Sequence, residues 1–427
     1  MIKNIHFMGI GGSGVAGVAA LASQMGFGVT GCDLEKNTAY SKNVVQGHSR
    51  DHLRGVDLVV ASPAVYFQNS NHPEFLEAKK QGKLITWQEF LGDYLTKGKK
   101  VICVAGTHGK STTTAMVAKL LIDAKFDPLA LVGAGVFKWR GNSRFGKGEY
   151  FVIEADEFFD SFLNYHPEII ILNNIEFDHP DYFKSETQLF NSYKSFIENF
   201  IGEKVLIVNS DDLGVNKLLK MINLDDFKII KYSPKKECLG LRLKVFGKHN
   251  IANALGVKAL GKYLGISKQI INDSLSTFEG IERRMQLLGM TKKGVLIYDD
   301  YAHHPTAISA TLQALREKYP NKRIWAIVEA HGYERTNTLL GSYKGVFSQV
   351  DKVIVGPIFK ARDKKTFGVT PEKIVKASKH KNALAANSFK QIQLILNKEV
   401  KSDDIILVMG AGKSYLWSRK LLKNLQQ

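Results

Sequence analysis

The stretch VAGTHGKSTTTAM, residues 104–116, contains side chains that could hold a phosphate group. The usual phosphate loop reads G-x-x-x-x-G-K-[ST], and Gly109, Lys110 and Ser111 fit its second half. Its first glycine is replaced by Val104. The loop is therefore shorter than usual, but it keeps the half that contacts phosphate and metal.

The surroundings of this loop favour a nucleoside-triphosphate site. An apolar run, 101–105, precedes the loop and a helix-like stretch follows it, so that backbone N–H groups and the helix N-terminus can hold phosphate oxygens. Lys110 would reach the transferred phosphate, and Ser111 or Thr112 would bind Mg²⁺. The residues that we predict for this site are Gly106, Thr107, His108, Gly109, Lys110, Ser111 and Thr112.

A second glycine-rich turn lies near the N-terminus. A short apolar run leads into G-x-G-G-x-G at 9–14, and a helix-like stretch and another strand-like run, ending at Asp33, follow. Such a turn lets the backbone approach a pyrophosphate, and the acidic residue can accept from a ribose hydroxyl. The ligand could be NAD or another diphosphate nucleotide. The residues predicted for this site are Gly9, Gly11, Gly12, Ser13, Gly14 and Asp33.

Polar residues cluster after two later apolar runs. Glu154, Asp156 and Glu157 lie in the motif EADE directly after YFVI, and acids at a strand end are natural Mg²⁺ ligands, although a solvated acidic loop is the simpler alternative. The run IIIL is followed by NNIEFDH, which ends in Asp178 and His179. We interpret His179 as a metal or phosphate ligand.

The last third of the chain contains further polar groups after strand-like runs. His303 and His304 follow one run, His331 and Arg335 follow another, and we expect all four at one sheet edge. Before them, Asn250 and Asn253 share a helix face and could read an adenine edge, or belong to an ordinary capped helix. A second glycine–lysine pattern, MGAGKSY, is interpreted as a structural turn.

Composition limits the possible functions. The 427 residues predict two or three domains, and 44% hydrophobic with 23% charged residues is globular composition. The net charge of +18 favours nucleic acid or phosphorylated small molecules as partners, but the lysines are scattered rather than massed in a nucleic-acid-binding arm. Cys32, Cys103 and Cys238 lack C-x-x-C spacing, which argues against disulfides and a zinc site.

The order of the runs predicts parallel sheets covered by helices, an α/β fold. We place boundaries near TKGKK and near Arg283–Arg284, which gives domains 1–97, 98–284 and 285–427. Glycines interrupt the apolar N-terminus, and no run reaches the roughly 20 apolar residues that span a bilayer. We therefore expect a cytoplasmic protein without membrane insertion.

Together, GTHGKSTTT, EADE, NNIEFDH, GKHNIANAL and DDYAHHPT resemble the Mur ligases, in that family's order and over essentially the whole chain. The resemblance implies three α/β domains: a Rossmann-like N-terminal domain, a central P-loop ATPase-type domain and a Rossmann-like C-terminal domain. It also implies ATP-dependent amide-bond formation in peptidoglycan precursor synthesis, with Mg²⁺. HFMGIGGSGVAG resembles the branch that binds UDP-N-acetylmuramate, so the N-terminal turn would hold the UDP end.

The resemblance also implies roles for single residues. Lys110, Glu154 and His179 would be catalytic, and the metal ligands would be Ser111, Thr112, Glu154 and His179. Asn250, Asn253, Arg284 and Asp300 would contact ATP. The incoming amino acid would meet Tyr301, His303, His331 and Arg335. Lys194 is a candidate for the carbamylated lysine of some members, although the branch resembled here does not rely on one.

Two substrates fit this branch: L-alanine, or a ready-made tripeptide (L-Ala-γ-D-Glu-meso-diaminopimelate) that is recycled. RGNSRFGKGEYFVIEADE and HGYERT favour L-alanine, whereas ILNNIEFDHPDYF and YAHHPTAI favour the tripeptide. Gly332 departs from the arginine that the alanine-using members usually have there. An NAD-dependent oxidoreductase would leave the second loop unexplained, and a nucleic-acid-binding protein has no matching motif. A monomer or homodimer is expected.

Overall fold

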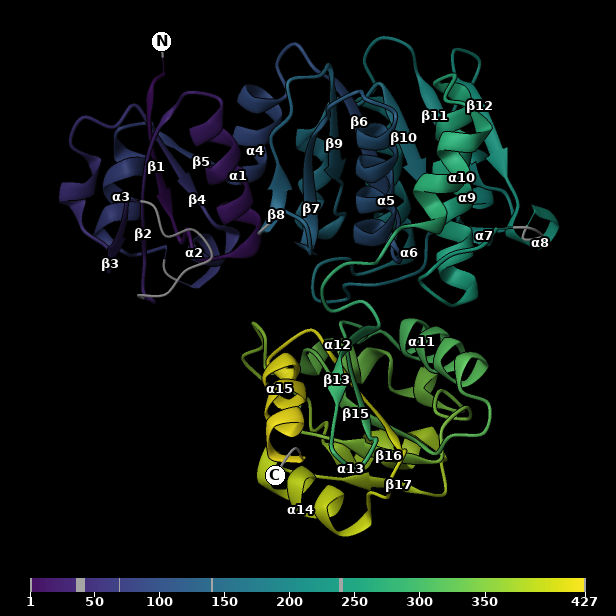
Figure 1. Cartoon of the computed structure of the whole chain (residues 1–427). Helices are drawn as coiled ribbons and strands as arrows, with labels where there is room; N and C mark the ends of the chain where they lie inside the picture. The colour runs from purple at the N-terminus through teal and green to yellow at the C-terminus, as the bar shows by residue number, and fades with distance from the viewer. Residues whose placement is uncertain (1, 36–42, 69, 140, 238–240, 426–427) are drawn as a thin grey trace. The chain divides into compact units, whose positions relative to one another are not determined.

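The computed structural model is an α/β protein whose described residues form three sheets (Figure 1). It describes residues 2–35, 43–68, 70–139, 141–237 and 241–425, so Cys238 lies outside the described residues. The chain divides into two compact units, which are described separately below. One unit comprises Met1–Glu176, Phe190–Gly240 and Asn253–Ser276, and the other Phe177–Leu189, Leu241–Ala252 and Thr277–Gln427.

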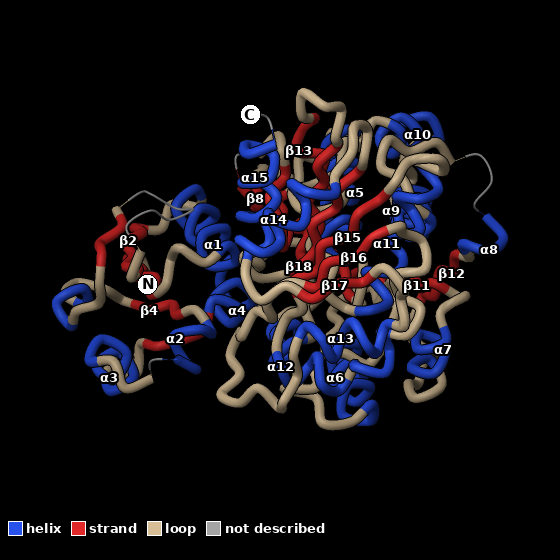
Figure 2. The backbone as a smooth tube through the Cα atoms, turned by 90° about the horizontal axis from the view of Figure 1, so that it is seen from below, coloured by secondary structure: helices blue, strands red, loops and turns tan. Residues whose placement is uncertain are grey.

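The N-terminal sheet belongs to the first unit. Its elements are β1 (Asn4–Met8), α1 (Ser13–Gln24), β2 (Gly28–Asp33), β3 (Val44–Gln46), η1 (Arg50–Leu53), β4 (Leu58–Ala61), α2 (Pro63–Gln68), α3 (Pro73–Lys80), β5 (Leu84–Thr86), α4 (Trp87–Phe90) and η2 (Leu91–Leu95). The strand order is β3-β2-β1-β4-β5, all parallel. In Figure 2, α1 and α3 lie on opposite sides of these strands.

Side chains alternate across this sheet. Phe7 of β1 points to one face, where its ring meets Phe90 edge-on at 5.8 Å. Its neighbour Met8 points to the other face and packs with Phe75 and Ala78 of α3. Because successive residues of a strand face opposite ways, His6 must share the α3 face with Met8.

The central sheet also belongs to the first unit. The elements along this stretch of chain are β6 (Lys100–Ala105), α5 (Lys110–Asp123), β7 (Leu129–Val136), β8 (Gly141–Arg144), β9 (Tyr150–Glu154), η3 (Phe158–Asn164), β10 (Ile169–Leu172), α6 (Glu186–Glu198), β11 (Val205–Asn209), α7 (Leu213–Leu219), β12 (Lys228–Tyr232), α8 (Pro234–Glu237), α9 (Lys248–Tyr263) and α10 (Lys268–Ser276). The first residues of α6 and α9 belong to the second unit. The order is β12-β11-β10-β6-β9-β7-β8, with β8 antiparallel to β7. β6, which precedes the phosphate loop, therefore lies between β9 and β10.

The C-terminal sheet belongs to the second unit. Its elements are β13 (Gln286–Met290), β14 (Leu296–Asp300), α11 (Pro305–Lys318), β15 (Ile324–Glu329), α12 (Tyr333–Thr338), η4 (Leu340–Tyr343), β16 (Lys352–Val355), α13 (Pro371–Ser378), β17 (Ala383–Ala385), α14 (Phe389–Glu399), β18 (Ile405–Gly410) and α15 (Ser414–Leu425). The order is β13-β14-β18-β15-β16-β17, with β13 antiparallel to β14. β14, β18 and β15 therefore end side by side at one edge.

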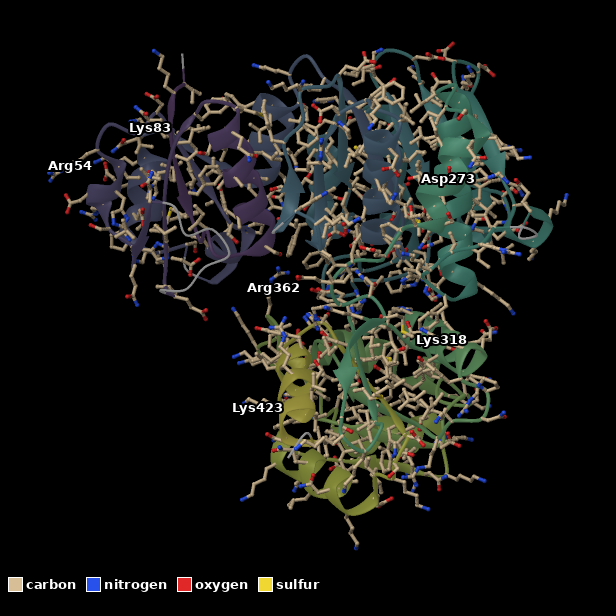
Figure 3. All side chains as sticks on the ribbon, viewed as in Figure 1. Arg54, Lys83, Asp273, Lys318, Arg362 and Lys423 are labelled. Carbon is tan, nitrogen blue, oxygen red and sulfur yellow. The ribbon has the colours of Figure 1, made fainter. Side chains whose placement is uncertain are left out.

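The predicted α/β fold with parallel sheets is confirmed, and every strand-like run named from the sequence is a strand. Basic side chains are spread over the molecule: Figure 3 labels Arg54 and Lys83 in the N-terminal domain and Lys318, Arg362 and Lys423 in the C-terminal one. Within the described part of the chain, no helix combines the length and apolarity needed to cross a bilayer.

Candidate active site

The short phosphate loop joins β6 to α5 and depends on its two glycines. Gly106 has φ +128°, and a Cβ there would lie 2.8 Å from the carbonyl oxygen of Asn174. Gly109 has φ +82°, and a Cβ there would lie 2.4 Å from Asn253 Oδ1. Side chains are therefore excluded at both positions, because the backbone conformation is left-handed and the space is filled. The second contact also places Asn253 beside the loop.

The polar residues after β10 hold this loop in shape. Asn174 accepts from the His108 N–H at 2.8 Å and donates to the His108 carbonyl at 3.1 Å. Thr107 Oγ1 donates to the Glu176 carbonyl at 3.0 Å and accepts from the Glu176 N–H at 2.9 Å. Some of the polar residues after β10 therefore hold the loop in position, although the sequence suggested them as ligand contacts.

Lys110 opens α5 and sits between two carboxylates. Its Nζ lies 2.7 Å from Glu157 Oε2 and 3.3 Å from Asp156 Oδ1. Burial lowers the pKa of Lys110, but Glu157 and Asp156 outweigh it and raise that pKa above its ordinary value. The ammonium therefore stays charged at neutral pH. Glu157, one of the three acids that the sequence suggests as metal ligands, is 1% exposed and contacts the lysine.

Ser111 and Glu154 form an oxygen-rich pair beside the lysine. The Ser111 hydroxyl donates to Glu154 Oε1 at 2.9 Å, and the Gly133 N–H donates to Oε2 at 2.5 Å. Val104 of β6 pairs with Glu154 of β9, so the sheet register brings the carboxylate to the loop. Hydroxyl and carboxylate oxygens suit Mg²⁺, so this pair fits the expected ion. Thr112 is also buried, at 7% exposure.

The N-terminal glycine turn follows β1 directly. Gly9 has φ +74°, and the Gly9 N–H donates to the Cys32 carbonyl at 2.9 Å. Asp33 Oδ2 accepts from the Gly11 N–H at 2.8 Å, so this carboxylate holds the turn itself. Gly12 caps α1, whose first residue is Ser13. A Cβ on Gly14 would lie 3.1 Å from the Trp87 ring, so this glycine allows close helix packing.

The second unit contains a buried ion pair among histidines. Arg335 of α12 donates to Asp178 Oδ2 at 2.5 Å, and both side chains are less than a tenth exposed. Burial raises the pKa of Asp178, but Arg335 and the nearby histidines outweigh it and hold that pKa below its ordinary value. His179 has φ +54°, and its Nε2 lies 4.0 Å from Asp178 Oδ2. The role of His179 as a metal ligand stays a prediction.

Three predicted amino-acid contacts lie together near this pair. The rings of Tyr301 and His303 are 5.3 Å apart, and those of His303 and His331 are 5.5 Å apart. Burial, followed by Arg335 and His331, places the pKa of His303 well below its ordinary value. Burial, followed by Arg335, lowers the pKa of His331 to about 4. Both imidazoles are therefore neutral at pH 7.

The lowered pKa of His331 predicts a pH-dependent stability. Because an unfolded histidine has a pKa of about 6.5, the unfolded chain binds more protons below that pH. Stability should fall as pH drops from about 6.5 to about 4, by about 3 kcal/mol for this group. Scanning calorimetry between pH 7 and pH 4 should show this loss, and His331→Gln should reduce it.

The exposed His166 provides the control. His166→Gln should unfold with the same pH dependence as the unchanged chain. If His331→Gln also leaves the pH dependence unchanged, His331 does not resist protonation in the folded state.

Asp300, Arg284 and Tyr301 lie where β14 ends. Asp300 accepts from the N–H groups of Met285 and Ala302, each at 2.7 Å, and burial raises its pKa despite Arg284. The Arg284 guanidinium lies 5.0 Å from the centre of the Tyr301 ring. The predicted ATP contacts at the start of this domain therefore form one local group.

The other sequence candidates are placed as follows. Asn250 of α9 is 6% exposed and donates to the Phe246 carbonyl at 2.8 Å. Lys194 is 41% exposed on α6 and lies 3.8 Å from Glu198, an ordinary surface pair one helical turn away. The second glycine–lysine turn lies between β18 and α15. There the Ser414 N–H donates to Glu329 Oε2 at 3.0 Å, which supports its structural interpretation.

Comparison with known proteins places the chain in a family. Three family models match in order: the Mur ligase family catalytic domain at residues 4–97, the Mur ligase middle domain at 104–239 and the Mur ligase glutamate ligase domain at 283–412. The chain belongs to the Mur ligase family. The matches agree with the three sheets described above.

Individual relatives are similar over nearly the whole chain. UDP-N-acetylmuramate–L-alanine ligases from Caldicellulosiruptor bescii and Clostridium tetani are 34% and 35% identical, covering 96% and 97% of this chain and 96% of each relative. The solved UDP-N-acetylmuramate–alanine ligase of Thermotoga maritima has a TM-score of 0.80 at 25% identity, covering 100% of this chain and 99% of that one. The murein peptide ligase of Psychrobacter arcticus, with the same identity and coverages, has a TM-score of 0.72.

Proposed function

We propose that this Mur ligase joins L-alanine to the lactyl carboxylate of UDP-N-acetylmuramate, using ATP and releasing ADP and phosphate. The observation that carries the proposal is Lys110, charged and fixed between Glu157 and Asp156 in a phosphate loop. The full-length relatives named for this reaction support it, as does the higher structural similarity to the alanine ligase than to the murein peptide ligase.

The chemistry requires activation of a poor electrophile. A lactyl carboxylate oxygen attacks the γ-phosphorus of ATP, and the bond to the β-phosphate oxygen breaks, which gives an acyl phosphate and ADP. The amine of L-alanine then attacks the acyl carbon, the C–O bond to phosphate breaks, and the nitrogen loses a proton. Lys110 and the loop N–H groups stabilise the charge on the transferred phosphoryl group.

Mg²⁺ would be held by Ser111 and Glu154, with Thr112 and His179 as further proposed ligands. When bound, such an ion neutralises phosphate charge between nucleotide and carboxylate. The chain's own contribution is the fixed position of these oxygens: Glu154 is held by the Gly133 N–H and by Ser111. Mg²⁺ itself and the individual ligands remain proposals.

The three substrates are assigned to different parts of the chain. The UDP end would lie on the turn Gly9–Gly14, and Asn250, Asn253, Arg284 and Asp300 would contact ATP. L-alanine would meet Tyr301, His303, His331 and Arg335. The Arg335 Nε is buried and has no hydrogen-bond partner among the described residues, so it can donate to a substrate carboxylate.

Phosphate release tests this function directly. The purified protein with UDP-N-acetylmuramate, ATP and Mg²⁺ should release phosphate when L-alanine is added. Mass spectrometry should show a product with the mass of UDP-N-acetylmuramate joined to L-alanine by an amide bond. Release with the tripeptide but not with L-alanine would overturn the proposal in favour of the recycling reaction. NADH fluorescence should not change on mixing, since the glycine turn is proposed to hold UDP.

We also propose further properties of this protein from its sequence. These are the domain boundaries at 97 and 284, a cytoplasmic location, a monomer or homodimer, and small-molecule substrates instead of nucleic acid.

A further inference from the structure

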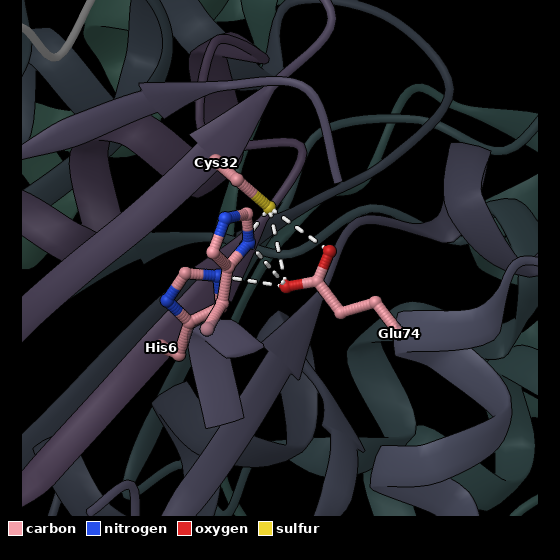
Figure 4. A group of neighbouring side chains, drawn as sticks. His6, Cys32 and Glu74 are labelled. Atoms are coloured by element: carbon pink, nitrogen blue, oxygen red, sulfur yellow. Dashed lines mark hydrogen bonds and ion pairs between the residues drawn. The ribbon is translucent and has the colours of Figure 1, made fainter. Parts of the chain in front are cut away.

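A group of metal-ligating side chains lies on one face of the N-terminal sheet. His6 of β1, Cys32 of β2 and Glu74 of α3 point toward one another (Figure 4). His52 of η1 joins them, and the ligand atoms of all four lie within 4.8 Å of one another. Met8 pairs with Cys32 and His6 with Thr30 in the register of β1 and β2. Strand alternation therefore places both His6 and Cys32 beneath α3.

The donor atoms all lie within 4.8 Å of one another, and four of their separations are close to those of a tetrahedral metal site. Glu74 Oε1 lies 3.0 Å from His6 Nε2, 3.0 Å from His52 Nδ1 and 3.5 Å from Cys32 Sγ. His6 Nε2 lies 3.3 Å from Cys32 Sγ. Zinc bonds of about 2.0 Å to N or O and 2.3 Å to S correspond to tetrahedron edges of about 3.3–3.6 Å. Small side-chain shifts would therefore seat a Zn²⁺ ion.

Neighbouring groups orient these donors as they do in metal sites. His6 Nδ1 lies 2.8 Å from Thr30 Oγ1, which leaves Nε2 free of the proton when Nδ1 donates. Glu74 Oε2 lies 3.0 Å from His48 Nδ1 and accepts from the Ser49 N–H at 3.2 Å. Oε1 faces His6 and His52. Cys32 Sγ lies close to both oxygens, at 3.5 Å from Oε1 and 3.4 Å from Oε2, and 3.0 Å from His48 Nδ1.

The site is enclosed and its charges suit a dication. The side chains of Glu74 and His6 are at most 2% exposed, Cys32 is fully buried and His52 is 15% exposed. A carboxylate and a thiolate with two neutral imidazoles balance two positive charges. An enclosed four-ligand set is typical of structural rather than catalytic zinc.

We propose that His6 Nε2, Cys32 Sγ, His52 Nδ1 and Glu74 Oε1 bind one Zn²⁺ ion that stabilises the N-terminal domain. The sequence lacked C-x-x-C spacing because these ligands come from four separate elements. The ion would also fix the end of β2, where the Cys32 carbonyl accepts from the N–H groups of Gly9 and Ile10. Zinc binding would therefore stabilise the start of the glycine turn.

Cobalt and zinc binding to the untagged, full-length protein test the proposal. Co²⁺ added to protein stripped with chelator should give tetrahedral visible absorption and a thiolate-to-cobalt charge-transfer band, and one equivalent of Zn²⁺ should abolish both. Oxygen and nitrogen ligands at the nucleotide loop cannot produce the thiolate band. Zinc retained after desalting, measured by mass spectrometry, should be one per chain.

Matched variants assign the ligands. Cys32→Ser should lose the charge-transfer band, whereas Cys103→Ala, which removes the buried cysteine of β6, should keep it. Thr30→Val removes only the partner of His6 Nδ1 and should weaken zinc binding roughly 10–100-fold. If Cys32→Ser does not fold, the zinc affinity of Thr30→Val still tests the proposal. A wild-type cobalt complex without the thiolate band, or a Cys32→Ser complex that keeps it, would overturn the proposal and leave a hydrogen-bonded cluster.

Discussion

Lys110→Ala should lower the rate of phosphate release by about 10³-fold, as expected when a group that stabilises transition-state charge is removed. Lys110 is proposed to supply the positive charge that stabilises the transferred phosphoryl group, and Glu157 and Asp156 hold its ammonium in place. Binding of UDP-N-acetylmuramate, measured by calorimetry, should be unchanged, because that substrate is assigned to the N-terminal turn.

Lys119 provides a matched control on the same helix. It pairs with Asp123 one turn along α5, near the surface. Lys119→Ala should therefore change the rate less than twofold. If Lys110→Ala also abolishes UDP-N-acetylmuramate binding, the loop supports the fold of the first unit and the catalytic assignment of Lys110 fails.

Arg335→Ala should both destabilise the second unit, which contains the C-terminal domain, and abolish use of L-alanine. Removing one partner of a buried ion pair typically costs about 3–5 kcal/mol, because the remaining charge is buried alone. Asp178 would be left in that position. Chemical unfolding should report the loss of stability, and phosphate release at saturating ATP should report the loss of alanine use.

A double variant separates the two effects. In Asp178→Asn combined with Arg335→Gln, no buried charge is left over, so stability should recover to within about 1 kcal/mol while alanine use stays lost. Lys322→Ala breaks an exposed pair with Asp403 in the same domain and should cost less than about 1 kcal/mol. If the double variant regains alanine use, Arg335 acts only in folding.

The fold was largely predictable because parallel strands leave a strong pattern. Buried strands such as Ile169–Leu172 and Ile405–Gly410 are continuous apolar runs between polar loops, and such runs are typical of sheets covered on both faces. Strand order was not predictable from these runs. That β6 lies between β9 and β10 follows from pairing across the chain, which single runs do not encode.

The sequence predicted which residues form the candidate site, but not which residues they contact. The sequence identified Lys110, Ser111 and Glu154, but it could not say that the lysine contacts Glu157 or that the serine contacts Glu154. Likewise, Asp33 is expected from the sequence to accept a hydrogen bond from a ribose hydroxyl. In the structure it accepts one from the Gly11 N–H. Hydrogen-bond partners depend on register and loop geometry, which the spacing of residues leaves open.

The histidine–cysteine cluster gave no signal in the sequence. His6, Cys32 and Glu74 are far apart in the chain, and each looks ordinary beside its neighbours. Only strand alternation and the position of α3 bring them to one point. A search for short metal-binding motifs cannot find a site assembled in this way.

The turn between β18 and α15 repeats the glycine–lysine pattern of the phosphate loop. Here, however, a carboxyl group of the protein itself already occupies the N-terminus of the helix that follows. Glu329, at the end of the neighbouring strand, places its carboxylate against the Ser414 N–H. A phosphate approaching this turn would meet the Glu329 carboxyl group, which already accepts from the first N–H of α15. The chain therefore has two loops with a similar glycine–lysine pattern, and we expect only the loop between β6 and α5 to bind ATP.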